Sequence, residues 1–403
     1  MLKAPLFFIL FHVLVCGAVA QDTISVMYYN LLKFPDEIPG RITDLRKIIG
    51  YTQPDIFVVN ELTDESGAVA ILNEALNVFG ADHYSAAEYV DGTDTDNMLF
   101  YNNEKLGLID QVQIPTGLRD ISGYKLYYKH PELGPSSDTI FLNVFGIHLK
   151  AGSGSFDQRK DEALVLKYYL NDMDIPENII AGGDFNFYSG NESGCQAMLD
   201  GADVYLFDPI DQIGNWSNNS FYADIHTQST RTSSFGTGAG GGMDDRFDLI
   251  FLSEDALYNE HGLTFLEGSY QALGQDGDRF NESIVIPFNP SVPDSISEAL
   301  YYMSDHLPLS LSLVTDYTAS VNNAPIETKL KLYYNTVENA IILNQTIPGG
   351  SLQIYNATGS LFGTYSVDNN QKIRLNERLA PGIYFCAGRL CKEQIGFSFL
   401  VPD

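Results

Sequence analysis

An aspartate and an asparagine stand two positions apart after an apolar run, in the stretch IIAGGDFNFYSG at residues 179–190. Alternate side chains of an extended chain face the same way, so Asp184 and Asn186 share one face and the two phenylalanines share the other. A carboxylate can orient or deprotonate water, and an amide can donate a hydrogen bond to an oxygen that becomes negative. The same residue types also end ordinary strands in turns, so this segment alone favours neither a catalytic site nor a turn.

Five other strand-like segments carry polar groups at or near their ends. These groups are Asn30 in SVMYYN, Glu61 in DIFVVNE, His148 and Lys150 in FLNVFGIHLK, Asp248 in DDRFDLIFLS, and Asp305 with His306 in MSDHLPLSLSL. Taken singly, each could be a solvated strand end. Taken together, they combine the oxygen ligands that hard divalent cations prefer with imidazoles that exchange protons near neutral pH. The set predicts one site at which several strand ends meet.

The elements that must position this site alternate along the chain from about residue 22 to residue 314. Strand-like runs such as TISVMYYN are followed by segments whose apolar residues recur at helical spacing, for example Ile42, Leu45 and Ile49. Another helix is expected around residues 163–170. The alternation indicates an α/β domain whose sheet is covered by helices.

The last part of the sequence has a different pattern. After the polar residues 315–329, short alternating runs such as SLQIYNATGSL and GIYFCAG are separated by glycine, asparagine and proline turns. We therefore expect a large domain over residues 21–315, a linker over 316–329 and a small β-sandwich over 330–403. Within the sandwich, Gly388 could turn a hairpin that brings Cys386 and Cys391 together, whereas Cys195 is expected to be a buried free thiol.

The start of the sequence and its charge bear on location and ligands. Residues 1–20 combine Lys3, an apolar run and Ala18-Val19-Ala20, which is the layout of a cleavable secretory signal peptide. We expect a mature protein that is secreted or associated with the cell surface, without stable membrane insertion. The formal net charge of −29 disfavours nonspecific binding to nucleic acid or anionic membranes. An anionic substrate would need local positive charge, which a bound divalent cation would supply most simply.

In this order, the motifs resemble the endonuclease/exonuclease/phosphatase superfamily, the deoxyribonuclease I-like fold of metal-dependent phosphoesterases. The resemblance rests on YYN with Asn30, NE with Glu61, HLK with His148, GGDFN with Asp184 and Asn186, DRFD with Asp248, and SDHLP with Asp305 and His306. It implies a four-layer α/β (α+β) sandwich in which two packed sheets are covered by helices. Asn60 stands where the family commonly has glutamine, which leaves the adjacent carboxylate of Glu61 in place.

The resemblance also implies a metal site. Glu61 would be the main ligand, and Asn30 and Asp305 would support it directly or through water. Mg²⁺ is the expected ion, with Mn²⁺ or Ca²⁺ as alternatives.

The implied catalytic residues surround this ion. Asp184 would orient or deprotonate the attacking water, and Asn186 would donate to a phosphoryl oxygen. His148 and His306 would contact the phosphate from either side, with their protonation left open. Asp248 would support His148 or the leaving-group side.

Two basic residues and one insertion complete the expected site. Lys150 and Arg159 in HLKAGSGSFDQRKDEA would supply positive charge for the phosphate, although a surface ion pair is the alternative for Arg159. The insertion at residues 213–231 contains Trp216 and His226. Trp216 could stack on a base or only pin the loop to the domain.

The segment from about residue 330 resembles the carboxy-terminal sorting domain of type IX secretion in Bacteroidetes, through SLQIYNATGSL and LAPGIYF. This implies the export machinery as a partner, and a β accessory domain that binds carbohydrate or another surface is the alternative. The leading interpretation of the whole chain is a secreted, monomeric phosphodiesterase that acts on DNA or RNA. A phosphomonoesterase or a sphingomyelinase-like lipid phosphodiesterase is the alternative, and a noncatalytic binding protein is a weaker one. The lipid alternative lacks support from any hydrophobic hairpin evident in the sequence.

Overall fold

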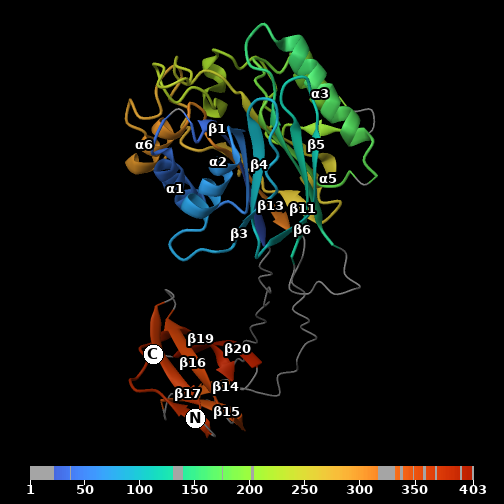
Figure 1. Cartoon of the computed structure of the whole chain (residues 1–403). Coiled ribbons are helices and arrows are strands. Elements are labelled where there is room, and N and C mark those ends of the chain that lie inside the picture. The colour runs from blue at the N-terminus through green and yellow to red at the C-terminus, as the bar shows by residue number, and fades with distance from the viewer. Residues whose placement is uncertain are drawn as a thin grey trace, which may run out of the picture. The chain divides into compact units, whose positions relative to one another are not determined.

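The structure is a computed structural model, and it describes residues 22–36, 38–129, 139–174, 176–200, 204–315, 332–335, 339–347, 349–356, 360–367, 370–390 and 393–401. The chain divides into two compact units, Met1–Ala319 and Ser320–Asp403, which we describe separately (Figure 1). The expected signal peptide and linker lie outside the described residues. Among the described residues, no helix is long and apolar enough to cross a membrane.

The first sheet of the larger unit has seven strands in the order β11-β13-β1-β2-β4-β3, with β12 paired to β13. Its strands are β1 (Thr23–Phe34), β2 (Ile56–Leu62), β3 (Tyr84–Ala86), β4 (Asp96–Asn102), β11 (Leu263–Phe265), β12 (Gln271–Ala272) and β13 (Leu309–Thr315). Only β1 and β2 pair in parallel. The helices that pack with this sheet include α1 (Arg41–Thr52), α2 (Glu65–Ala70), η1 (Ile71–Leu76) and α6 (Asp294–Met303), whose buried apolar residues join its core (Figure 1).

The second sheet has six strands in the order β5-β6-β7-β8-β10-β9. They are β5 (Leu106–Ile114), β6 (Ile121–Tyr128), β7 (Phe141–His148), β8 (Ile179–Asp184), β9 (Leu206–Phe207) and β10 (Asp248–Ser253). The remaining helices of this unit are α3 (Phe156–Asn171), α4 (Ser193–Leu199), η2 (Ser220–Ile225) and α5 (Glu254–Tyr258). Apolar residues of α3 and α4 share a core with Phe185 and Phe187, which follow β8. The two phenylalanines therefore anchor the segment that carries Asp184 and Asn186.

The two sheets pack face to face through one shared core. Tyr28 of β1 is fully buried, and its hydroxyl donates to the carbonyl oxygen of Ile180 in β8 at 3.1 Å. A Cβ atom at Gly182 would lie 2.6 Å from the Tyr28 ring, so glycine is required for this close approach. The predicted sandwich of two sheets covered by helices is confirmed.

The smaller unit is all-β, as predicted, and has its own core. One sheet has the order β14-β15-β18 and the other β17-β16-β19-β20. The strands are β14 (Leu332–Asn335), β15 (Ala340–Ile347), β16 (Gly350–Asn356), β17 (Leu361–Val367), β18 (Asn370–Arg374), β19 (Gly382–Leu390) and β20 (Glu393–Val401). Gly388 does not turn the hairpin but lies within β19, and β19 and β20 pair up to Leu390 and Glu393. Cys386 is a buried free thiol, as is Cys195, and Cys391 lies outside the described residues.

Candidate active site

Strand register brings three polar residues of the second sheet side by side. β7 and β8 run parallel with His148 opposite Asp184, and β10 runs antiparallel to β8 with Asp248 opposite Asp184. Directly opposed residues of neighbouring strands place their side chains on the same face of a sheet. His148, Asp184 and Asp248 therefore form one row at this edge, and each is at most 4% exposed.

The glycines before Asp184 let strand β8 approach strand β7 closely. Gly183 adopts a φ of +134°, and a Cβ atom there would lie 2.1 Å from the carbonyl oxygen of Ile147. Any other residue would push β8 away from β7 at the position that carries the carboxylate. The Asp184 amide also donates to the side chain of Asn60 at 3.3 Å, and Asn60 donates to Asn97 at 2.6 Å. Asn60, which stands where the family commonly has glutamine, thus holds the backbone of Asp184 in place.

The first sheet adds an amide and a second carboxylate to this row. The Asn30 side-chain nitrogen donates to Glu61 Oε1 and to Asp184 Oδ2, each at 3.0 Å. Glu61 has a φ of +63°, a left-handed conformation that is unfavourable for a residue with a side chain. Strain of this kind is concentrated at functional sites because the surrounding structure must hold it in place. The two sheets therefore meet at two carboxylates that share one amide donor.

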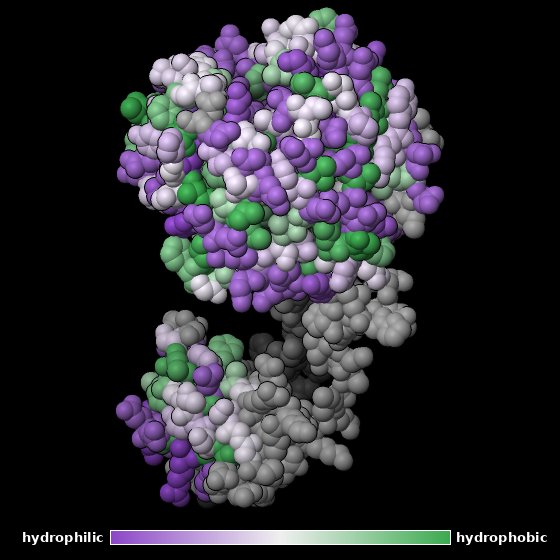
Figure 2. Space-filling view, viewed as in Figure 1, coloured by the Kyte–Doolittle hydropathy of each residue, from purple (hydrophilic) through white to green (hydrophobic). Residues whose placement is uncertain are grey.

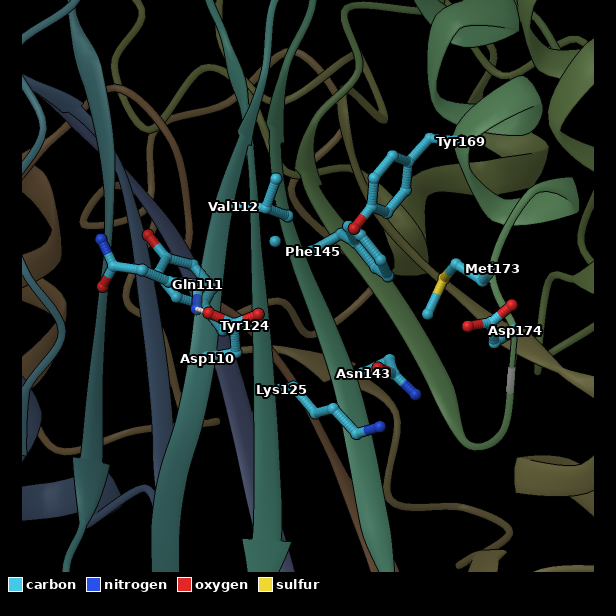
Figure 3. A pocket seen from close by; sticks show the side chains of 11 residues that line it. Asp110, Gln111, Val112, Tyr124, Lys125, Asn143, Phe145, Tyr169, Met173 and Asp174 are labelled. Atoms are coloured by element: carbon cyan, nitrogen blue, oxygen red, sulfur yellow. Dashed lines mark hydrogen bonds between the residues drawn. The ribbon is translucent and has the colours of Figure 1, made fainter.

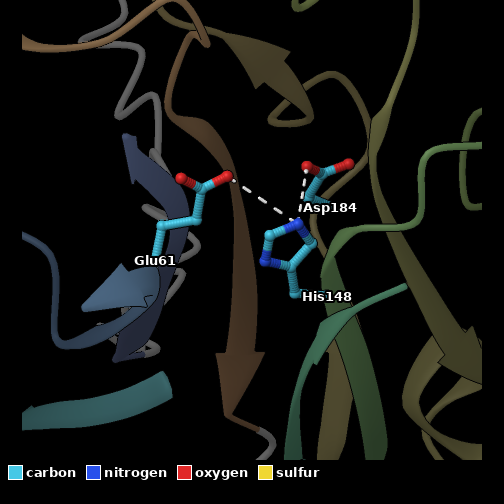
Figure 4. Close-up of side chains that lie close together, drawn as sticks. All are labelled: Glu61, His148 and Asp184. Carbon is cyan, nitrogen blue, oxygen red and sulfur yellow. Dashed lines mark ion pairs between the residues drawn. The ribbon is translucent and has the colours of Figure 1, made fainter. Parts of the chain in front are cut away.

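Two imidazoles approach the same carboxylate oxygen. His148 Nε2 lies 3.5 Å from Asp184 Oδ2 and 3.8 Å from Glu61 Oε1 (Figure 4). His306 Nε2 lies 3.8 Å from Asp184 Oδ2, while its Nδ1 lies 2.8 Å from Asp248 Oδ2. Asp248 thus supports His306 and not His148, which was one of the two roles predicted for Asp248.

Burial and neighbouring charges separate the protonation of the two histidines. Burial, together with the positive charges of Arg119, His306 and Lys150, lowers the pKa of His148 well below its usual value. Burial alone would also lower the pKa of His306, but the carboxylates of Asp248 and Asp184 outweigh it and raise that pKa well above its usual value. The two shifts favour the neutral form of His148 and the protonated form of His306, a point that the sequence left open.

Asp184 is the other strongly perturbed group. Burial raises the pKa of its carboxyl to about 7, because the stabilising charge of His306 is opposed by the carboxylates of Asp248 and Glu61. A carboxyl with this pKa can take up and release a proton near neutral pH. Asp184, which can accept a proton, therefore lies within 4 Å of His306, which can donate one.

Three side chains could hold a metal ion together. Glu61, His148 and Asp184 each offer one ligand atom, and these atoms lie within 4.8 Å of one another. Two carboxylates that face each other repel, and a divalent cation between them would remove that repulsion. A neutral imidazole is also the form that ligates metals. The donor set therefore fits a divalent cation.

This group shares only Glu61 with the predicted ligand set. Asn30 directs its amide nitrogen to the carboxylates, and its oxygen accepts from the backbone of Leu32 at 2.9 Å. Asp305 Oδ2 accepts from the amide of Ala239 at 2.7 Å and from Gln228 at 3.1 Å. Its Oδ1 is buried without a hydrogen-bond partner among the described residues. Asp305 is thus held beside His306 rather than in the three-residue group.

The predicted phosphate-binding residues have different surroundings. Lys150 lies close enough to His148 to lower the pKa of that residue. Arg159 is fully buried, and its guanidinium donates to Glu192 and to the carbonyl oxygens of Lys150 and Gly152. The expectation that Arg159 binds substrate is corrected, because this residue braces the loop that carries Lys150.

The insertion at residues 213–231 also differs from expectation. Trp216 is fully buried and its indole nitrogen donates to the carbonyl oxygen of Phe187, so it cannot stack on a base. His226 is buried against the carbonyl oxygen of Trp216 at 2.8 Å. The insertion nevertheless contributes Gln228, whose side-chain nitrogen lies 2.7 Å from His306 Nε2. Nothing in the local sequence distinguishes Gln228 from the other polar residues of this loop.

Arg119 is a second residue that the sequence analysis missed. Its Nη1 lies 3.4 Å from the carbonyl oxygen of Leu149, which also accepts from the side chain of Asn186 at 3.2 Å. Its Nη2 lies 2.8 Å from Asp94 Oδ2, and its Nε is buried without a partner among the described residues. Arg119 therefore places a positive charge beside Asn186, at the turn between β5 and β6.

A depression elsewhere on the second sheet contains none of the predicted site residues. It has a volume of about 390 Å³ and lies against β5, β6 and β7, beside Tyr169 and Met173 (Figure 3). Its side chains include both acidic and basic groups, but they belong to a separate surface from the strand ends described above. The strand-end cluster is therefore the candidate active site.

Comparison with known proteins identifies the family of the chain. A model described as the Endonuclease/Exonuclease/phosphatase family matches residues 27–306. No curated protein matches the sequence.

Three solved structures illustrate the similarity of fold. D. rerio TDP2 complexed with single-strand DNA product is 12% identical, with 72% of this chain and 98% of that chain covered and a TM-score of 0.48. The human nocturnin catalytic domain with bound sulfate is 17% identical, with 73% and 98% covered and a TM-score of 0.43. A family protein from Bacteroides thetaiotaomicron is 16% identical, with 73% and 96% covered and a TM-score of 0.41.

Proposed function

The chain belongs to the endonuclease/exonuclease/phosphatase family of phosphoester hydrolases, and from this premise we propose that it is a metal-dependent phosphodiesterase that hydrolyses nucleic acid. The observation that carries the proposal is the set of atoms around Asp184 Oδ2. One amide nitrogen and two imidazole nitrogens lie within 3.8 Å of this oxygen, and the pKa of the carboxyl is raised to about 7 by burial. Such a group can accept a proton from water at neutral pH.

The protonated imidazole supplies the opposite chemistry. His306 is fixed by Asp248 through Nδ1, and its Nε2, which faces Asp184, would carry the second proton of the charged form. It can stabilise negative charge on a phosphoryl oxygen or give a proton to the leaving oxygen, while Asp184 orients and deprotonates the water. The side chain of Gln228 contacts this same Nε2, with its nitrogen 2.7 Å away.

Glu61, His148 and Asp184 would hold a divalent cation, which we propose to be Mg²⁺, with Mn²⁺ or Ca²⁺ as alternatives. Such an ion stabilises the charge that develops on phosphoryl oxygens during displacement. The chain's own contribution is to keep the two carboxylates in place through Asn30 and to keep His148 neutral.

Fixed positive charge beside the site supports an anionic substrate. Arg119, Lys150 and the amide of Asn186 gather near Leu149 and His148 in a chain whose formal net charge is −29. Arg119 contributes its charge at a distance, because its Nη2 is paired with Asp94 and its Nε is buried. These groups would orient the substrate while Asp184 and His306 act on it.

The substrate class follows the nuclease members for which the family is named, and a phosphomonoester or a phospholipid is the alternative. We also propose that the chain is exported as a monomer, with residues 1–20 removed and the smaller unit recognised by type IX secretion. The signal-like start and the motifs SLQIYNATGSL and LAPGIYF support the export part of this proposal.

One experiment separates these substrates. The purified mature chain is incubated with plasmid DNA, RNA, a chromogenic phosphate ester and sphingomyelin, each with Mg²⁺ and with a chelator. We expect cleavage of nucleic acid in Mg²⁺ and no cleavage in chelator or by Asp184→Ala. Activity on sphingomyelin or on monoesters alone would replace the nuclease proposal, and unchanged turnover of Asp184→Ala would remove Asp184 from the mechanism.

A further inference from the structure

Three consecutive apolar residues are exposed at the tip of one loop of the larger unit. Ile286 is 72% exposed and Phe288 is 71% exposed, and Pro287 between them is also exposed. We call these three residues the apolar tip. This run is short and broken by proline, so it does not stand out in the sequence as a hydrophobic hairpin. The face of the larger unit drawn in Figure 2 is mostly hydrophilic with scattered apolar residues, so a fixed apolar tip needs an explanation.

Buried polar contacts hold this loop in one conformation. Arg279 is 1% exposed and donates to the carbonyl oxygens of Ser283, Pro287 and Phe288, while Asp276 holds its other edge at 2.9 Å. Asn289 is 2% exposed and donates to the carbonyl oxygens of Gly274 and Ile284. The tip is therefore ordered before any partner arrives, which lowers the entropy lost on binding.

The tip is connected to the catalytic cluster and continues into an apolar groove. Ile284 donates its backbone N–H to Thr230, and Thr230 donates its own to Asp305, at 2.9 and 3.0 Å. The groove beside Ile286 is lined by Val285, Tyr301 and Tyr302 and has a volume of about 520 Å³. The loop that carries the tip is thus tied by backbone hydrogen bonds to the segment that carries Asp305.

Charge determines what kind of surface the tip fits. Among the residues that the structure describes, no lysine or arginine lines the groove, and the arginines that contact its residues, Arg231 and Arg279, are buried. Glu282 and Glu298 line the groove. Nucleic acid or an anionic membrane would be repelled there, and a second copy of this chain would bring the same carboxylates face to face.

We propose that the apolar tip docks reversibly on a zwitterionic lipid surface. Ile286 and Phe288 enter the apolar layer, and the outward ammonium groups of the lipid heads lie next to Glu282 and Glu298. A convex tip of two large side chains suits insertion into a deformable layer better than it suits a preformed protein groove. This docking does not depend on which phosphate ester the catalytic site hydrolyses.

The test is flotation of the full mature chain with phosphatidylcholine vesicles. We expect binding that falls about tenfold or more in the double variant Ile286→Ser/Phe288→Ser, because two exposed apolar side chains then gain nothing from insertion. Phe79→Ser is the matched control, since Phe79 is 93% exposed at a different place in the unit, and it should bind as the unchanged chain does. Replacing part of the phosphatidylcholine by phosphatidylglycerol should weaken binding.

Four results would overturn the proposal. They are no binding of the unchanged chain to phosphatidylcholine, equal binding by the double variant, equal loss in Phe79→Ser, and stronger binding to phosphatidylglycerol. Sedimentation without lipid adds a fifth, a dimer abolished by the double variant, which would assign the tip to self-association. Hydrolysis of a small soluble phosphate ester should be the same in the double variant, so that failure of docking is distinguished from failure of the catalytic proposal.

Discussion

Buried carboxylates in two regions of the larger unit differ in how their charge is compensated. Asp208 receives hydrogen bonds on both oxygens from Arg246, at 2.9 and 2.8 Å, and both side chains are almost fully buried. Glu192 pairs in the same manner with buried Arg159. In the candidate active site, Glu61 and Asp184 instead share one amide nitrogen, and the nearest positively charged group to Asp184 is His306 at 3.8 Å.

The difference lies in where the compensating charge comes from. A buried ion pair that is complete within the chain holds loops and strands together, and it is strongly destabilising only when one partner is removed. The catalytic carboxylates have too little positive charge of their own, so burial raises the pKa of Asp184 to about 7. The missing charge is what a divalent cation would bring. The first region thus fixes structure, whereas the second is arranged to bind and react.

Removing the charge of Asp184 should give the largest effect on activity. We expect Asp184→Asn to lower kcat by about 10²–10⁴-fold, because general-base catalysis is lost, while the melting temperature at pH 8 does not fall. Asparagine keeps the shape and removes a poorly compensated buried charge. Turnover of the most readily cleaved substrate and thermal unfolding, measured on the same preparation, check both parts. A melting temperature that falls along with the activity would show that Asp184 is a structural charge like Asp208.

Breaking the ion pair of Arg246 and Asp208 should lower the stability of the fold. We expect Arg246→Met to lower the free energy of unfolding by about 3–5 kcal/mol, because Asp208 is left buried without its partner. The double variant Arg246→Met/Asp208→Leu should recover much of this loss, since no charge then remains buried. Denaturant unfolding of the three proteins measures the coupling. If the double variant is no more stable than Arg246→Met, the packing of Arg246 against Trp216 and Tyr270 dominates instead of its charge.

The same contrast explains what the sequence could predict. The layers follow from apolar periodicity, and the place of Asp184 follows from the glycines and alternating phenylalanines around it, which are local patterns. Whether a charged residue is paired depends on partners far along the chain. Arg159 was expected at the phosphate because Glu192, 33 residues away, is not visible as its partner in the sequence. Arg119 and Gln228 were missed for the same reason, since only the fold brings them to Leu149 and His306.

Supplying the missing charge should stabilise the active-site region. We expect Mg²⁺ or Mn²⁺ to raise the free energy of unfolding by about 2.7 kcal/mol at one hundred times its Kd, because the ion binds the folded state. Glu61→Gln should lose this response, and Glu282→Gln, which removes an exposed carboxylate from another surface, should keep it. Thermal unfolding against metal concentration measures the difference. An equal response in both variants would mean that the ion binds the acidic surface in general.

The charge on Asp184 should also be measurable without metal. Its folded-state pKa of about 7 lies above the ordinary value of 3.8 for an aspartate, so between these values the folded chain binds more protons than the unfolded chain. The stability contributed by this group is therefore complete at low pH and is lost as the pH rises toward 7. In chelator, we expect the unchanged chain to lose about 1.4 kcal/mol per pH unit relative to Asp184→Asn in this window, the value for one proton. Parallel stability curves for the two proteins would show that Asp184 is compensated within the chain, and the contrast between the two regions would then disappear.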